Sequence, residues 1–246
     1  MGEISYDSQV AEDYRVAREI PRAGLAAWRE AIAAEAALAP GMTVLDVGAG
    51  TGAFAAAFHD WFGVRVVAVE PAEAMRAMIP SVPEIEVLDG YADALPVPDS
   101  SADAAWLGSV LHHLPDLAAA ARELRRALKP RAPVLIRNIF PGRCDRDLRV
   151  RYFPETAHAI ATYPSVEQTC AAFATAGFHR VALHSVPQES AANLEEFAAK
   201  IRRDADSKLR GLTDEEFARG MDRLTASAAI MPSQPATSWM DLLVLA

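Results

Sequence analysis

Cysteine and long apolar runs are scarce in this chain of 246 residues. The two cysteines, Cys144 and Cys170, are far apart and neither belongs to a CxxC motif, which argues against a disulfide framework and against a thiolate metal site. No run of about 18 apolar residues offers a membrane span, and residues 1–15 lack the apolar centre of a secretory signal. We therefore expect a cytoplasmic protein without a bound metal and without a membrane partner.

Positive charge is also in deficit. The chain has 24 Lys and Arg against 33 Asp and Glu, for a formal net charge of −9. Nucleic-acid binding depends on a basic face that neutralises phosphates, so we expect no nucleic-acid partner. The basic clusters at 122–131 and 143–151 are interpreted as solvated surface. A small-molecule substrate is the favoured partner, for a monomer or a homodimer.

Apolar strand-like segments alternate with helical ones along most of the chain. An amphipathic helix is predicted over 22–39, ending near Gly41. The alternation then predicts a parallel sheet with helices on both faces, and the pairs Ser165 with Gln168, Asn193 with Glu196 and Thr213 with Glu216 mark helix starts. The predicted strands are 43–47, 64–70, 84–88, 102–108, 132–140, 178–186 and 237–246, and the first crossover helices are 53–62, 72–79 and one begun by Asp116.

Three helical stretches exceed what the sheet needs as crossovers. They lie at about 1–40, 145–163 and 190–231. Open α/β sheets bind ligands at the carboxyl edge of their strands. We therefore predict a single domain over 1–246, in which these stretches form a helical lid above that edge.

The densest glycine run, "DVGAGTGAF" at 46–54, directly follows the first predicted strand. Gly48, Gly50 and Gly52 allow a sharp turn and a close approach of a ligand to the backbone. With Glu70 about 20 residues downstream, the run also satisfies a loose dinucleotide pattern, so an NAD-linked oxidoreductase stays open on these features. Asp46 favours a different cofactor, because its charge opposes a pyrophosphate but helps to hold an ammonium group.

Four segments in order resemble the motifs of class I S-adenosylmethionine-dependent methyltransferases. They are "VLDVGAGTG" (44–52), "VEP" (69–71), "YADALPVPDSSAD" (91–103) and "SVLHHLPD" (109–116). Residues 5–18 similarly resemble the N-terminal lid helix of the members that act on small molecules. The resemblance implies a Rossmann-like, doubly wound seven-stranded sheet of order 3-2-1-4-5-7-6 with the last strand antiparallel, and S-adenosylmethionine as the methyl donor.

The resemblance also implies a role for individual residues around the cofactor. Asp46 and the loop backbone would hold the methionine portion, Glu70 with Pro71 the ribose hydroxyls, and Asp93 with the Tyr91 and Ala92 backbone the adenine. The floor near the sulfonium would be built from Gly108, Ser109 and Val110, and the lid would add Tyr14 and Arg18. The loop residues implied in cofactor binding are Gly48, Ala49, Gly50 and Gly52.

Methyl transfer is an in-line displacement that gains much of its rate from alignment in a dry pocket, so a strong catalytic motif is not required. His112 or His113 is the candidate general base, and the sequence does not separate them; packing of the loop is the alternative role of the pair. A metal site built on His112, His113 and Asp116 is disfavoured, since no further ligand is evident. The residues predicted to line the acceptor pocket are Asn138, Arg151, Tyr152 and Tyr163.

The acceptor is expected to be a small organic molecule methylated at oxygen, nitrogen or carbon. This expectation comes from segments 136–143, 151–155 and 163–178, which resemble methyltransferases of actinobacterial secondary metabolism. An RNA methyltransferase and a cofactor-binding protein without turnover remain alternatives beside the oxidoreductase.

Overall fold

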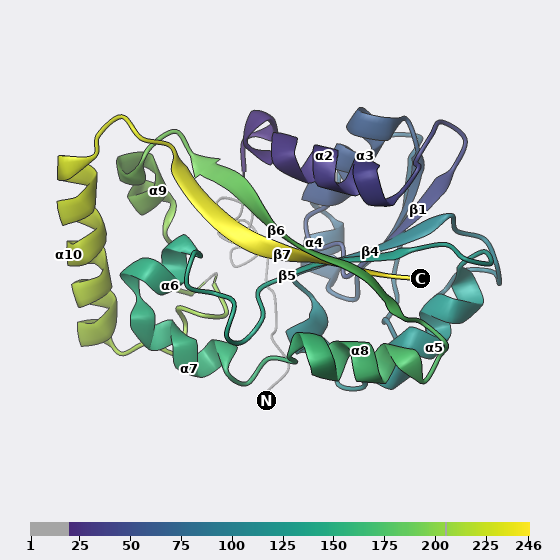
Figure 1. The fold of residues 1–246 in the computed structure, drawn as a ribbon. Coiled ribbons are helices and arrows are strands. Elements are labelled where there is room, and N and C mark those ends of the chain that lie inside the picture. The colour runs from purple at the N-terminus through teal and green to yellow at the C-terminus, as the bar shows by residue number, and fades with distance from the viewer. Residues whose placement is uncertain (1–19, 205) are drawn as a thin grey trace.

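The computed structural model describes residues 20–204 and 206–246, which form an α/β fold around one mixed sheet (Figure 1). The strand order is β3-β2-β1-β4-β5-β7-β6. β1 to β5 are parallel, whereas β7 runs antiparallel to both β5 and β6. The predicted fold class and strand order are therefore confirmed. The strands are β1 (Thr43–Val47), β2 (Arg65–Val69), β3 (Ile85–Leu88), β4 (Ala104–Gly108), β5 (Val134–Asn138), β6 (Arg180–Ala191) and β7 (Ala236–Leu245).

The sheet is buried on both faces, and its side chains alternate between two apolar clusters. In β1, Val44 packs into one cluster and Leu45 into the other. In β7, Leu242 and Leu243 divide in the same way. This period of two is the reason that the strands read as continuous apolar runs in the sequence.

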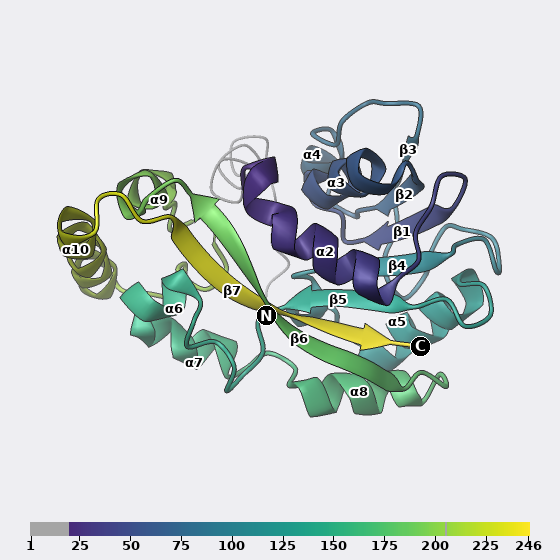
Figure 2. The same cartoon turned by 45° about the horizontal axis from the view of Figure 1, so that its top comes forward.

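Helices cover the two faces of the sheet (Figures 1 and 2). α2 (Ala26–Glu35) and α3 (Ala53–Phe62) lie on one face, and α5 (Leu117–Ala127) and α8 (Val166–Ala174) lie on the other. Trp28 and Phe58 belong to the first cluster, and Leu124 and Phe173 to the second; all four are fully buried. The shorter elements are η1 (Arg22–Leu25), α4 (Glu73–Arg76), η2 (Leu111–His113) and η3 (Pro154–Thr156).

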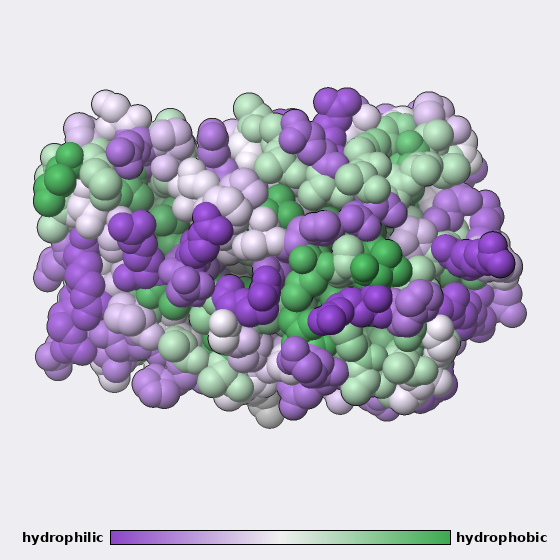
Figure 3. All heavy atoms as spheres, in the orientation of Figure 1, coloured by the Kyte–Doolittle hydropathy of each residue, from purple (hydrophilic) through white to green (hydrophobic). Residues whose placement is uncertain are grey.

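A group of helices extends beyond one end of the sheet (Figure 1). It consists of α6 (Leu148–Tyr152), α7 (Ala157–Ile160), α9 (Leu194–Lys200) and α10 (Asp214–Ile230). A third apolar cluster, with Phe153, Phe197 and Leu224 among its members, joins α6, α9 and α10, whereas Ile160 of α7 belongs to the first cluster. The outer side of α10 is hydrophilic along most of its length in Figure 3. These helices correspond to the predicted stretches 145–163 and 190–231.

The first predicted helix differs from the structure in its end and in its place. It ends at Glu35, since Ala36 takes extended dihedral angles, and Gly41 lies instead in the turn before β1. α2 packs flat on a sheet face, because Trp28 and Ile32 are buried completely. α2 is thus a layer of the fold, whereas Arg22 and Leu25 of η1 line a cavity at the carboxyl edge of the sheet. Residues 1–19, with the expected Tyr14 and Arg18, lie outside the described residues.

Local sequence signals fixed several helix starts. Ser165 with Gln168 and Thr213 with Glu216 form capping boxes, as predicted. The Asn193 side chain accepts a hydrogen bond from the Glu196 amide at the start of α9. In the part of the chain that the structure describes, no helix has the length and apolar character needed to cross a membrane.

Candidate functional site

The glycine loop connects β1 to α3 at the carboxyl edge of the sheet. Gly48, Gly50 and Gly52 have φ values of +70°, +57° and +78°, which is left-handed backbone that favours glycine. A Cβ on Gly48 would lie 2.5 Å from Val110 Cγ2. The loop therefore needs glycine at position 48 both for its dihedral angles and for its close approach to the loop after β4.

Asp46 lies beneath this loop, on β1, where the strand order reverses between β1 and β4. Its side chain is 2% exposed, and no described residue donates a hydrogen bond to Oδ2. Burial, with a smaller contribution from Glu70, raises the pKa of Asp46 to about 8. A buried carboxylate oxygen without a donor is costly, and a cationic ligand group would relieve that cost.

Glu70 supports the glycine loop from the end of β2. Its Oε2 accepts a hydrogen bond from the Gly50 amide at 2.8 Å, and its Oε1 accepts one from the Ala72 amide at 3.0 Å. Burial raises the pKa of Glu70, and the two amides together with Arg76 offset only part of that rise. The carboxylate is thus fixed at the carboxyl edge with its two oxygens turned toward backbone amides.

The predicted cofactor residues after β2 and β3 follow the carboxyl ends of these strands and differ in exposure. Pro71 and Asp93 are exposed, Tyr91 is 58% exposed, and Ala92 packs against the second apolar cluster. These groups form an open border, in contrast to the buried Asp46.

Ser109, directly after β4, has the unusual φ of +60°, a conformation that costs energy in a residue other than glycine. Its amide donates to the Arg137 carbonyl at 2.7 Å, and its hydroxyl oxygen accepts a hydrogen bond from Arg137 Nη1 at 3.0 Å. These two bonds hold the floor after β4 to the neighbouring strand β5.

A cavity of about 540 Å³ opens beside the glycine loop. It combines residues of η1, the glycine loop, and the ends of β4, β5, β6, α6 and α9. The predicted cofactor residues that line it are Asp46, Gly48, Ala49, Gly50, Gly52, Gly108 and Ser109. The other predicted cofactor residues do not line this cavity; they are Glu70, Pro71, Tyr91, Ala92, Asp93 and Val110. Of these, Glu70 and Val110 lie against the glycine loop.

Neither candidate base lines the cavity. The His112 ring stacks on Tyr163 at a centroid distance of 4.2 Å, and its Nε2 lies 3.4 Å from Ser207 Oγ. His113 is exposed, with its ring 4.0 Å from that of His112. Among the residues described, no group of three or more His, Cys, Asp or Glu side chains is placed to hold a metal ion.

The predicted acceptor residues lie elsewhere than expected. Asn138 is buried in the sheet, and its side-chain amide donates a hydrogen bond to the Ile139 carbonyl oxygen. Tyr152 packs into the third apolar cluster. Arg151 is exposed, and Tyr163 is buried with its hydroxyl 3.2 Å from Ser207 Oγ. None of these four residues lines the cavity beside the glycine loop, and their role at an acceptor pocket stays a prediction.

Sequence reasoning missed a polar wall of the cavity that β5 and β6 supply. Arg137, on β5, donates to Ser109 and, at 2.6 Å, to Gln188 Oε1 on β6, and its guanidinium lies 5.3 Å from the Phe54 ring centroid. Ser190 of β6 is part of the same wall. One signal was available, since Arg137 is the charged residue within the apolar strand sequence "VLIRN".

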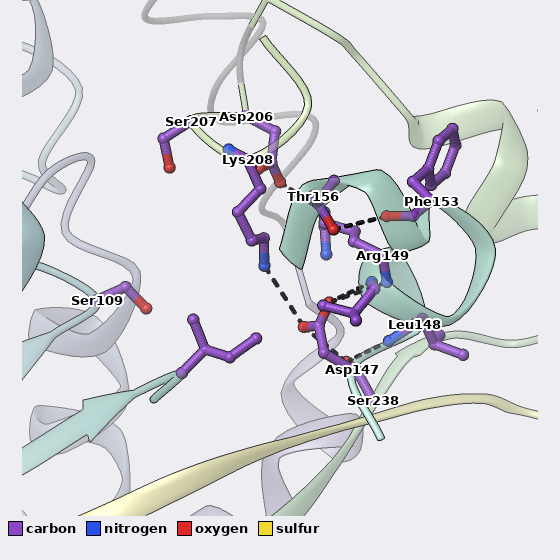
Figure 4. Close-up of polar contacts among 12 residues, drawn as sticks. Ser109, Asp147, Leu148, Arg149, Phe153, Thr156, Asp206, Ser207, Lys208 and Ser238 are labelled. Carbon is purple, nitrogen blue, oxygen red and sulfur yellow. Dashed lines mark hydrogen bonds and ion pairs between the residues drawn. The ribbon is translucent and has the colours of Figure 1, made fainter. Parts of the chain in front are cut away.

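A buried network of charges supports this wall from the helical side (Figure 4). Arg149 Nε lies 2.6 Å from Asp206 Oδ2, and Lys208 Nζ lies 3.5 Å from Asp147 Oδ2. Asp147 also caps α6 and accepts a hydrogen bond from Ser238. Burial raises the pKa of Asp147, but the nearby charges of Lys208 and Arg149 lower it by more than burial raises it. The pKa of Asp147 is therefore below its ordinary value. The network fixes Arg149 at the cavity.

Comparison with known proteins agrees with this geometry. Residues 45–136 match a methyltransferase domain family. A hydroquinone methyltransferase (2-methyl-6-phytyl-1,4-hydroquinone) of Synechocystis is 32% identical over 120 residues, covering 47% of this chain and 37% of the relative. A ubiquinone/menaquinone biosynthesis C-methyltransferase of Caulobacter vibrioides is 30% identical over 136 residues, covering 50% of this chain and 54% of the relative. The chain thus spans about half, or less, of the length of these curated relatives.

Solved structures show the same fold across nearly the whole chain. A putative methyltransferase from an antibiotic biosynthesis pathway of Anabaena variabilis has a TM-score of 0.71 at 20% identity, covering 94% of this chain and 99% of that one. A phosphoethanolamine N-methyltransferase of Haemonchus contortus has a TM-score of 0.63 at 17% identity, covering 98% of this chain and 57% of that one. A methyltransferase domain family thus matches residues 45–136, and solved methyltransferases share the fold of nearly the whole chain. Both findings agree with the resemblance of the four motifs.

Proposed function

We propose that this protein transfers a methyl group from S-adenosylmethionine to an oxygen, nitrogen or carbon atom of a small organic molecule. The observation that carries the proposal is Asp46. Its buried Oδ2 has no donor among the described residues and lies beside a glycine loop with three left-handed residues. An amino-acid ammonium group can donate a hydrogen bond to this oxygen and favours its ionised form, whereas a pyrophosphate offers it no donor, so an NAD-linked oxidoreductase is the weaker alternative.

The residues around the loop divide the cofactor among themselves. We assign the methionine portion to Asp46 and the backbone of 48–52, and the ribose hydroxyls to Glu70 with Pro71. The open border formed by Tyr91, Ala92 and Asp93 is assigned to the adenine, and Gly108, Ser109 and Val110 to the floor near the sulfonium. Tyr14 and Arg18 stay predictions, because they lie outside the described residues.

When bound, the cofactor supplies an electrophilic methyl group on a sulfonium. The protein's own contribution is alignment and exclusion of water. Gly48 and Ser109 hold the two loops of the cavity at fixed positions, and the aromatic side chain of Phe54 lines the cavity wall. Where the acceptor atom loses a proton, His112 is our candidate base in preference to His113, because its ring is half-buried and stacked on Tyr163.

A small acceptor fits the dimensions of the cavity. A volume of about 540 Å³ lies within the range typical of small-molecule sites. The curated relatives named as quinone methyltransferases and the negative net charge both support a metabolite over RNA. We further propose a role in secondary metabolism in the cytoplasm, where the free thiols of Cys144 and Cys170 suit a reducing environment.

The proposal is tested by calorimetry with S-adenosylhomocysteine and NADH on the wild type, Glu70→Ala and Glu73→Ala. Wild type should bind S-adenosylhomocysteine and not NADH. Glu70→Ala should lose about 1.5 to 3 kcal/mol of binding free energy, as expected for hydrogen bonds to a charged group. Glu73 is exposed on α4 and serves as the matched control, which should bind like wild type. Binding of NADH alone would overturn the proposal.

Transfer itself is tested with radiolabelled S-adenosylmethionine and a panel of metabolites beside bulk RNA. The radiolabelled methyl group should be transferred to at least one of the metabolites. A protein that binds S-adenosylhomocysteine but methylates RNA and none of the metabolites would contradict the proposed acceptor class.

A further inference from the structure

The cavity has further polar lining, from β5, β6, α6 and α9, that the cofactor roles above do not use. Ser190 and Gln188 contribute to it from β6, Arg149 from α6 and Lys200 from α9. Ser190 is 6% exposed, and its hydroxyl has no hydrogen-bond partner among the residues that the structure describes. Buried hydroxyls normally have partners, so this hydroxyl points to a polar group on a ligand.

Cations dominate the lining of the cavity. Arg22, Arg137, Arg149 and Lys200 line it, while Asp46 is the one acidic residue in the described lining. Cavities lined by one sign of charge with apolar walls concentrate ligands of the opposite sign. Carboxylates outside the lining, Asp60, Asp206 and Glu196, pair with Arg22, Arg149 and Lys200. What the lining offers an anion is therefore a set of cationic hydrogen-bond donors that are already in place.

The cations are held in place by partners of their own. Arg137 is fixed by the neutral side chains of Ser109 and Gln188, and Lys200 pairs with Glu196 one turn earlier on α9 at 2.6 Å. Arg149 is held by Asp206 in the buried network of Figure 4. Charged groups that are already oriented lose less freedom on binding a ligand.

Apolar side chains lie directly beside these cations. Phe197 and Ile201 line the cavity, and the Arg149 guanidinium lies 5.4 Å from the Phe197 ring centroid. Leu25 and Phe54 line the cavity as well. A ligand that fills this space presents an apolar body to these side chains and an anionic group to the cations.

We propose that the part of the cavity formed by Arg137, Arg149, Gln188, Ser190 and Lys200 binds the oxyanion group, a carboxylate or a phosphate, of an apolar methyl acceptor. The inference rests on the proposed function and names the acceptor class for the same site. A guanidinium presents paired donors that match the oxygens of either anion, and the Ser190 hydroxyl is placed to add a further donor. The competing occupant is the carboxylate of the cofactor's own methionine portion.

The experiment titrates naphthoate, naphthyl phosphate and uncharged naphthamide into protein saturated with S-adenosylhomocysteine, followed by calorimetry. At least one of the two anions should bind about tenfold or more tightly than the amide, as a charge-assisted hydrogen bond predicts. The two anionic probes distinguish a carboxylate acceptor from a phosphate acceptor. Equal affinity for all three probes, or no binding of either anion, would overturn the inference.

Lys200→Gln and Ser190→Ala test the site itself. Each should weaken the preferred anion about fivefold or more while leaving S-adenosylhomocysteine affinity unchanged. The matched control is Arg219→Gln, which removes the cation of another i,i+4 pair, with Glu215, on α10 away from the cavity. That variant should bind every probe like wild type.

The outcomes separate this inference from the proposed function. If Lys200→Gln weakens S-adenosylhomocysteine and leaves anion binding unchanged, this part of the cavity holds the cofactor carboxylate, and the acceptor assignment is wrong although the methyltransferase assignment stands. If wild type fails to bind S-adenosylhomocysteine, the proposed function itself is wrong.

Discussion

Replacing Asp46 by asparagine should change cofactor affinity and protein stability in opposite directions. The pKa of Asp46 is raised from 3.8 to about 8 by burial and by Glu70. In the free protein at pH 7 the side chain is therefore mostly protonated, although the same group is ionised in the unfolded chain. The stability that protonated Asp46 supplies is present below about pH 4 and is lost as the pH rises through 8.

The cofactor ammonium requires the ionised carboxylate. Ionising Asp46 at pH 7 against a pKa of about 8 costs about 1.4 kcal/mol, and a charge-assisted hydrogen bond contributes about 1.5 to 3 kcal/mol. Asp46→Asn removes this charge, so S-adenosylhomocysteine affinity at pH 8 should fall by on the order of 1 to 2 kcal/mol, or about 5- to 30-fold. The variant should also be more stable than wild type at that pH, because it no longer ionises a buried group.

Calorimetry across about pH 6 to 8 is the decisive assay. Wild-type affinity should rise with pH by up to about tenfold per unit and level off above 8, and binding should release a proton. Asp46→Asn should show neither effect. The control is Asp103→Asn. The pKa of Asp103 is shifted in the opposite direction to that of Asp46, because burial raises it by less than Lys129 and the Thr43 amide together lower it. The Asp103→Asn protein should therefore lose stability and keep its cofactor affinity. A wild-type affinity independent of pH, or an Asp46→Asn protein with wild-type affinity, would refute the reasoning.

Two further predictions concern packing and buried charge. Gly48→Ala should lower the free energy of unfolding by about 1 to 3 kcal/mol more than Gly142→Ala, because both positions have a positive φ but only a Cβ at position 48 meets a neighbour. The difference is measured from the midpoints of urea unfolding. Equal losses for the two variants would contradict the contact. Asp147→Ala should lower the free energy of unfolding by about 3 to 5 kcal/mol, since it removes a helix cap and also the carboxylate that pairs with the buried Lys208. Asp116→Ala removes a helix cap alone and should cost about 1 kcal/mol. Thermal denaturation measures both losses. Similar losses for the two caps would mean that the buried ion pair adds nothing.

The features that could be predicted from the sequence are those encoded within a few neighbouring residues. The glycine loop, the capping boxes at Ser165 and Thr213, and the apolar runs of the strands depend on local dihedral preference and on periodicity. The strand order followed from the resemblance of four successive motifs. Asp46, which favours a cofactor with an ammonium group over one with a pyrophosphate, can be identified from the sequence because its position relative to the first strand is a local property.

Helix phase explains why Arg149 lines the cavity and the predicted Arg151 does not. Arg149 and Arg151 are two positions apart on the five-residue helix α6, which turns them about 200° from each other. Arg149 consequently lines the cavity, and Arg151 is exposed. A helix this short has too little periodicity in its sequence to show which side faces the protein.

By itself, the sequence determined the glycine-loop part of the cavity, because strand, glycine turn and acidic residue follow one another along the chain. Only the tertiary structure decided which residues of β5, β6 and α9 complete the lining. Arg137 on β5 is 51 residues away from Gln188 on β6, and Lys200 lies on α9, the helix that follows β6; no local pattern marks the meeting of the arginine with the other two. Their convergence depends on the antiparallel placement of β7 between β5 and β6 and on the packing of α9 near them, which are long-range contacts that form only when the whole chain folds.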